Sequence, residues 1–335
     1  MIDRISRRQA LGLVAGATAA TVTAPAVVKA QGQGAVLRIG TVITPPHPVV
    51  AVLEEFKKRV EERTNRGITV QIFHTAQLGG EREMAEGMRL GSIEGAAITL
   101  AAVTTWVPQG GVFDLPFVFK DDDHALRVYN GAPAKRLAEF YPPQGFRVLG
   151  YTLSGVRNLF STYPIAKPDD VRGRKMRTLQ SPLHIAIWKT VGANPTPIPH
   201  PEVYGALQTK VVEIADNTAT NYVNERWYEV APNYSTTGHI YAIGATFVSE
   251  RWFQRQKPEH QKALADSMAD VVPMQHKLIL AQDAESLGKA EKAGAKIIRI
   301  TDRAAWSEPM RPIWNEWAGQ HATHKELFDA MMATS

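Results

Sequence analysis

The stretch EVYGALQTKVVEIADN, from Glu202 to Asn217, contains the pattern that decides the fold. Its first part, opened by Pro201, has apolar residues at helical spacing, and the run Val211–Ala215 predicts a strand. Asp216 and Asn217 follow, although a sheet core is normally apolar. An amide at a strand end offers a donor and an acceptor at the mouth of a sheet. Asn217 is therefore a candidate binding residue, with a turn residue as the alternative interpretation.

The same alternation of helix and strand extends in both directions. Strands are predicted at 36–40, 68–72, 96–99, 147–152, 175–179 and 296–300, and the main helices at 48–65, 82–90, 122–129, 132–140, 182–191 and 258–292, the last broken by Pro273. Two such series indicate two α/β domains of parallel strands, with crossovers near 150–155 and 240–246. A ligand would bind between them, where strand ends and helix N-termini face each other.

The first 30 residues have the composition of an export signal. SRRQAL at 6–11 precedes a stretch rich in Ala, Gly, Thr and Val, and VKA at 28–30 provides small residues for cleavage. The pattern Ser-Arg-Arg-x-x-Leu predicts the twin-arginine route. A retained membrane anchor is the alternative, but Thr, Gly and Pro25 make a poor spanning helix.

Charge and composition exclude several classes of function. The formal net charge is +5, and residues 1–30 contribute four basic residues against one Asp, or +3, which leaves 5 − 3 = +2. No run of five Lys or Arg occurs, so we expect no nucleic-acid partner. There is no cysteine, and no nucleophile-elbow, zinc-protease or phosphate-loop motif. We therefore expect no catalytic residues, no metal and no cofactor.

Two arginines stand out near the predicted sheet. Arg157 follows Gly155 just past a predicted strand end, and Arg177 lies inside the strand Lys175–Leu179. A buried arginine is costly unless it is paired. Its partner is either an internal Asp or Glu, or the carboxylate of a ligand, whose geometry a guanidinium matches with two parallel hydrogen bonds. Ser181 begins a helix near Arg177 and adds backbone donors that favour an anion.

Six stretches in order resemble one family. They are AQLGGERE (76–83), LGSIEGA (90–96), FDLPFVF (113–119), GRKMRT (173–178), GANPTPIPHPEVYGALQTKVVEIADN (192–217) and TTGHIY (236–241). Between about residues 37 and 250 the chain resembles the dicarboxylate-binding type of solute-binding proteins of tripartite ATP-independent periplasmic (TRAP) transporters.

The resemblance implies a two-domain periplasmic binding protein of the α/β class, with an interdomain ligand cleft and a long bridging helix. Its parts would be a signal peptide (1–30), domain I (31–154 and about 243–282) and domain II (155–242 and about 283–335). It also implies a periplasmic monomer that binds a small carboxylate without catalysis and delivers it to a TRAP membrane permease. A periplasmic enzyme, a sensor and an ATP-cassette-type binding protein are the rival interpretations.

The resemblance also assigns roles to individual residues. Arg177 matches the arginine that grips the ligand carboxylate, Arg157 a second arginine, and Asn217 the family's amide. Further expected contacts are Gln180, Ser181, Glu81 and Thr99. His200 stands where many relatives place an aromatic ring against the ligand, and together with Pro273 it departs from the family pattern.

Overall fold

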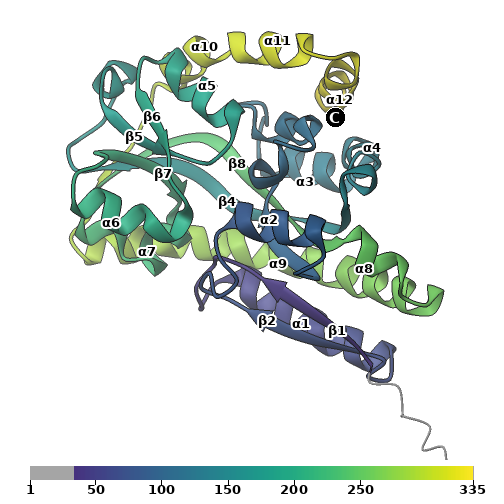
Figure 1. The fold of residues 1–335 in the computed structure, drawn as a ribbon. Coiled ribbons are helices and arrows are strands. Elements are labelled where there is room, and N and C mark those ends of the chain that lie inside the picture. Colours follow the sequence, from purple (N-terminus) through teal and green to yellow (C-terminus); the bar gives the residue numbers. More distant parts are fainter. Residues whose placement is uncertain (1–33, 335) are drawn as a thin grey trace, which may run out of the picture. The chain divides into compact units, whose positions relative to one another are not determined.

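The structure, a computed structural model, describes residues 34–334, so the predicted signal peptide lies outside the described residues. These residues form a mixed nine-stranded sheet in the order β2-β1-β3-β8-β4-β7-β5-β6, with β9 beside β8 (Figure 1). The strands are β1 (Ala35–Gly40), β2 (Ile68–Phe73), β3 (Gly95–Thr99), β4 (Phe146–Ser161), β5 (Lys175–Thr178), β6 (Asn194–Pro197), β7 (Ile214–Thr218), β8 (Asn233–Ser249) and β9 (Lys296–Ile298).

Helices pack on this sheet, and many begin where the sequence predicts. They are α1 (Pro48–Arg63), α2 (Glu81–Leu90), α3 (Asp122–Asn130), α4 (Ala132–Ala138), α5 (Pro182–Thr190), α6 (Val203–Gln208), α7 (Ala219–Asn224), α8 (Glu250–Gln254), α9 (Pro258–Lys292), α10 (Arg303–Met310), α11 (Pro312–Gly319) and α12 (Ala322–Met332). Proline at the first position explains several starts, because its fixed φ suits a helix and its missing N–H has no helical partner there.

The alternation of helices and strands in the sequence predicted parallel strands, but the sheet is mixed. β1 pairs in parallel with β2 and β3, β5 with β6 and β7, and β8 with β9. The pairs β3–β8, β4–β8 and β4–β7 are antiparallel. The predicted crossovers at 150–155 and 240–246 lie inside β4 and β8, which have 16 and 17 residues. The C-terminal part of β8 pairs with β3 and that of β4 pairs with β7. These two strands therefore connect the β1–β3 group to the β5–β7 group.

Two boundaries near the opening stretch were predicted wrongly. The α-helix begins at Val203, after a short 3₁₀ turn at His200–Glu202, and β7 begins at Ile214. Asp216 and Asn217 consequently lie inside β7 and are buried. The register of β7 is set by its pairing with β4, in which Asn217 lies opposite Asn158. That partner is far away in sequence, so local pattern could not place the strand.

The predicted break of α9 at Pro273 is also wrong, because the helix continues through this proline and is 35 residues long in all. Contacts on both sides of the proline support the helix. On one side Asp270 pairs with Arg59 and Arg63 of α1. On the other, Asp283 accepts hydrogen bonds from the backbone and hydroxyl of Thr220 in α7.

Between those two contacts, the Gln275 side chain bonds both backbone groups of Leu153 in β4. The register of β4 with β8 is irregular just there, between Leu153 and Val156. The long helix therefore supports the middle of β4 and contacts elements of both strand groups (Figure 1).

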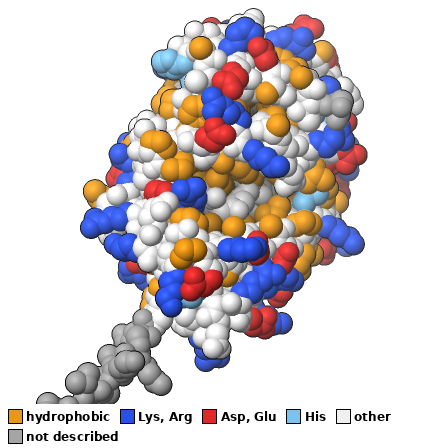
Figure 2. Space-filling model, turned by 90° about the vertical axis from the view of Figure 1, so that its right-hand side faces the viewer, with side chains coloured by type: hydrophobic (Ala, Val, Ile, Leu, Met, Phe, Trp, Pro, Cys, Tyr) orange, Lys and Arg blue, Asp and Glu red, His pale blue; other side chains and the backbone are white. Residues whose placement is uncertain are grey.

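The apolar core has two parts. The larger cluster includes Leu37, Ile39 and Phe56, and a smaller one forms around Phe160 and Trp227, whose rings stack at 5.1 Å. Basic and acidic side chains are interspersed over the face shown in Figure 2. In the part of the chain that the structure describes, we find no helix with the length and apolar character of a membrane span.

Candidate functional site

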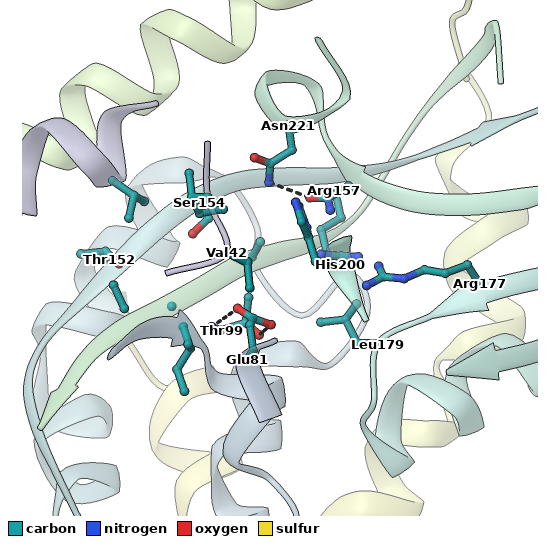
Figure 3. A pocket seen from close by; sticks show the side chains of 17 residues that line it. Val42, Glu81, Thr99, Thr152, Ser154, Arg157, Arg177, Leu179, His200 and Asn221 are labelled. Carbon is teal, nitrogen blue, oxygen red and sulfur yellow. Dashed lines mark hydrogen bonds between the residues drawn. The ribbon is translucent and has the colours of Figure 1, made fainter. Parts of the chain in front are cut away.

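A cavity of about 550 Å³, counting the space open to solvent, lies between the two strand groups. One wall comes from the segment after β1, from β3, from the first residue of α2 and from Thr152 and Ser154 in the first part of β4. The other comes from Arg157 further along β4, from β5 and from β7 (Figure 3). The lining residues are Val42, Ile43, Val49, Glu81, Ala97, Ile98, Thr99, Thr152, Ser154, Arg157, Arg177, Leu179, His200, Asn217, Asn221, Ala242 and Gly244.

Arg177 lies in β5 and is only 4% exposed. Its Nε donates to the carbonyl of Ile198 at 2.9 Å. Within residues 34–334, no Asp or Glu forms an ion pair with this guanidinium, whereas Arg157 has such a pair. Burial, and next the positive charge of Arg157, lower the pKa of Arg177 to about 10. The cavity therefore holds a desolvated cation without a paired anion.

Arg157, unlike Arg177, is paired with an acid of the protein. It lies inside β4 rather than past its end, which corrects the predicted location. Its Nε and Nη2 donate to the side chain and backbone oxygens of Asp216, both at 2.6 Å. Burial alone would raise the pKa of Asp216, but Arg157 and His239 hold it well below its usual range. Arg157 therefore has the internal acid partner that the sequence left open as an alternative.

Asn217 contributes an amide beside the two arginines. Its Oδ1 accepts from the backbone N–H of Thr218 at 2.9 Å. It also accepts from Nδ2 of Asn221 at 3.0 Å (Figure 3). These bonds fix the side chain through its oxygen. The amide nitrogen therefore remains a donor for another acceptor in the cavity.

Glu81 and Thr99 form a fixed pair on the other wall. Thr99 donates its backbone N–H to Glu81 Oε1 and its hydroxyl to Oε2, each at 2.8 Å (Figure 3). Glu81 is the first residue of α2 and Thr99 the last of β3. The two bonds orient the carboxylate because they join the helix start to the strand end.

The structure brings together six of the eight predicted residues: Arg157, Arg177, Asn217, His200, Glu81 and Thr99. Gln180 lines an adjoining pocket that shares Arg177 and His200. Ser181 is fully buried outside the cavity lining, with its Oγ 3.2 Å from the hydroxyl of Thr104. The ligand contacts of these residues remain predictions.

Sequence reasoning missed three polar lining residues, Thr152, Ser154 and Asn221. Thr152 and Ser154 alternate along β4, and this period of two was the available signal once the strand was known to continue. Asn221 lies in α7, a short helix that the sequence did not suggest.

A second cluster of titratable groups touches the cavity at His200. His200 Nε2 is 3.7 Å from Glu225 Oε1, and its ring packs against Trp227. His47 is buried nearby and caps α1, with Nδ1 accepting from the N–H of Val49 at 3.1 Å. Burial, with a smaller contribution from His200, lowers the pKa of His47 to about 3.

We expect acidification to destabilise the fold through His47. The unfolded chain, with a histidine pKa near 6.5, takes up the proton before the folded chain does. The contribution of His47 to the free energy of unfolding is therefore complete above pH 6.5 and is lost as the pH falls toward 3. By pH 5 the loss is about 2 kcal/mol. Urea unfolding at pH 7 and pH 5 measures this loss.

Matched variants assign the effect to one residue. His47→Asn keeps a capping side chain but removes the titration, so its loss on acidification should be smaller than that of the parent protein. His321→Asn changes an exposed histidine and should behave like the parent. An unchanged loss in His47→Asn would contradict the prediction.

Comparisons with known proteins show the family to which the chain belongs. The family model DctP, described as bacterial extracellular solute-binding protein, family 7, matches residues 39–320. A solute-binding protein of Chromohalobacter salexigens is 30% identical over 84% of each chain, and a C4-dicarboxylate-binding periplasmic protein of Rhodobacter capsulatus is 28% identical over 93% of this chain and 94% of its own.

A solved relative has the same fold. It is a TRAP periplasmic solute-binding protein from Xanthobacter autotrophicus with bound β-D-galacturonate, and it superposes with a TM-score of 0.86 at 29% identity, over 89% of this chain and all of its own. The sheet order, the long helix and the cavity thus occur in a chain that matches the family model over most of its length. The chain therefore belongs to family 7 of the bacterial extracellular solute-binding proteins, the DctP family, which includes the TRAP solute-binding proteins.

Proposed function

We propose that this protein captures an organic acid outside the cytoplasm and delivers it to a TRAP membrane permease. One observation carries the proposal: Arg177 is a buried cation that faces a cavity and has no ion-pair partner in the described part of the chain. A ligand carboxylate would supply the missing anion and match the guanidinium with parallel hydrogen bonds. The uronate bound by the Xanthobacter relative and the name of the Rhodobacter relative support this ligand class.

Binding would proceed in two steps. The carboxylate first docks on Arg177, beside the free amide donor of Asn217. The predicted domains, 31–154 with about 243–282 and 155–242 with about 283–335, then close by a hinge motion through β4 and β8. Closure excludes water, which strengthens each charge-assisted hydrogen bond, and such a bond is worth about 1.5–3 kcal/mol.

The cycle needs no chemical step on the ligand. The polar groups of the cavity are disposed around it as donors and acceptors, which suits recognition and release. The proposal also includes export by the twin-arginine route and action as a monomer, which the SRRQAL segment and the family resemblance support.

A thermal-shift experiment tests this function. We expect a carboxylic acid ligand at 100 times its dissociation constant to stabilise the ligand-stripped protein by about 2.7 kcal/mol, because it binds only the folded state. The matching alcohol or amide, which lacks the charge, should cause no shift. A panel of uronic, aldonic, C4-dicarboxylic and aromatic acids in which no member raises Tm would overturn the proposal. Uptake assays with and without the binding protein then test delivery to the permease.

A further inference from the structure

The two arginines of the cavity differ in whether an acid of the protein already pairs with them. Arg157 gives Nε and Nη2 to Asp216, so its positive charge is matched within the protein. Arg177 is the cavity cation that lacks such a match among residues 34–334. One guanidinium is therefore available to pair with an anionic group of the ligand.

The opposite side of the cavity has a different character. Thr152 and Ser154 lie across the cavity from Arg177, and Glu81 projects into the space between them (Figure 3). Each Glu81 oxygen accepts one bond from Thr99, and a carboxylate oxygen has a second lone pair available. Within the described range, the hydroxyls of Thr152 and Ser154 have no hydrogen-bond partner in the protein. This side therefore offers neutral hydroxyls and a negatively charged acceptor.

A ligand meets these groups according to its own chemistry. Hydroxyl groups would donate to Glu81 and exchange hydrogen bonds with Thr152 and Ser154. A second carboxylate has no proton to donate, and it would add a like charge beside Glu81 in a site shielded from water. Among the described residues, the charged groups that line the cavity are Glu81, Arg157 and Arg177. Arg177 holds the first carboxylate and Arg157 is paired with Asp216, so neither is available to a second carboxylate. Arg82 lines the adjoining pocket with Glu81, but it pairs with Glu86.

We propose that Glu81 is a specificity-determining residue that selects monocarboxylic acids bearing hydroxyl groups and rejects dicarboxylic acids of the same length. The inference rests on the proposed function, because it needs a carboxylate on Arg177. The competing view is that Glu81 only ties α2 to β3 through Thr99. In that case its charge would have no influence on the choice between the two kinds of acid.

Calorimetric titration of the ligand-stripped mature protein with two matched pairs tests the proposal. D-Erythronate and meso-tartrate form one pair, and D-galactonate and galactarate the other. In each pair only the terminal group changes, from CH₂OH to carboxylate. We expect the monocarboxylate to bind at least tenfold more tightly than its dicarboxylate partner. In Glu81→Gln, which keeps an acceptor oxygen but loses the charge, this ratio should fall at least tenfold.

Two further variants separate charge from structure. Glu81→Asp keeps the negative charge and should retain a preference for the monocarboxylate. Glu86→Gln removes an exposed carboxylate from the same helix, where it pairs with Arg82, and should leave the ratio unchanged. Circular dichroism and thermal unfolding confirm that each variant folds. If Glu81→Gln does not fold, the affinity ratios of the wild-type protein and of Glu81→Asp remain as tests. Equal binding of the two acids in either protein would contradict the role of Glu81.

The outcomes distinguish this inference from the function on which it rests. Wild-type protein that binds the dicarboxylates as tightly as their partners would overturn the role of Glu81 and leave acid capture intact. If the preference for the monocarboxylate over the dicarboxylate is the same in Glu81→Gln as in the wild-type protein, the role of Glu81 is also overturned. If none of these acids and no member of the thermal-shift panel binds, the proposed function itself fails.

Discussion

Replacing Arg177 with methionine should weaken organic-acid binding by about 30- to 5,000-fold, because truncating one partner of a buried charge pair typically costs 2–5 kcal/mol. The same change should stabilise the ligand-free fold. Lowering the pKa of Arg177 from 12.5 to about 10 corresponds to roughly 3 kcal/mol against the charged form in its buried position. Losing the bond to the Ile198 carbonyl offsets about 1 kcal/mol of that gain.

Calorimetric titration and urea unfolding of the ligand-free protein measure the two effects. Arg172→Met is the matched control, because Arg172 is 69% exposed and should change neither quantity appreciably. Unaltered affinity for the acid in Arg177→Met would refute the carboxylate clamp. Lower stability of the ligand-free variant would show that Arg177 has an internal partner in solution.

Replacing Arg157 with methionine should have the opposite effect on stability. The change leaves the Asp216 carboxylate buried with only His239 beside it, at 3.2 Å from Nε2. Breaking a buried pair in this way typically costs 3–5 kcal/mol, because the remaining charge is uncompensated. We therefore expect Arg157→Met to lower the free energy of unfolding by about that amount at pH 7, measured by urea unfolding.

A double-mutant cycle tests the cause. Arg157→Met combined with Asp216→Asn removes both charges, and it should be markedly more stable than Arg157→Met alone. If the two substitutions add without coupling, the pair is not the source of the effect.

Much of the fold could be predicted because the signals are local. Apolar spacing defines α1, and period-two alternation defines β2. Pro48 and Pro182, each the first residue of its helix, mark helix starts for steric reasons that no distant contact alters. β1 and β3 were likewise predicted within one residue of their limits.

The long strands could not be predicted, because their sequence resembles that of loops. β4 contains Gly150 and Gly155, and Gly155 has φ of +114°, a backbone conformation that favours glycine. A Cβ at Gly155 would also collide with the Asp283 carboxylate, which accepts from the N–H of Val156. The irregular register between β4 and β8 accommodates these residues, and only the neighbouring strand and helix make such a segment a strand.

The site was predicted in part for the same reason. Residue type and position identified Arg177 as an arginine within a strand, and the family resemblance added Glu81 and Thr99. The partner of Arg157 was beyond local reasoning, since Asp216 lies 59 residues away and meets it only because β4 and β7 pair. Family knowledge treated both arginines as ligand contacts, whereas charge pairing in the folded chain distinguishes them.

The division of the cavity between two walls has a consequence for transport inhibition. Arg177 and Asn217 come from the β5–β7 group. Thr99 comes from β3 of the β1–β3 group, and Glu81 comes from α2, which precedes β3. A short acid such as acetate would occupy the arginine without reaching Glu81, so it would not favour closure. Under the proposed cycle, the permease would not accept cargo from this half-engaged state. Short carboxylates should therefore act as competitive inhibitors of uptake rather than as substrates.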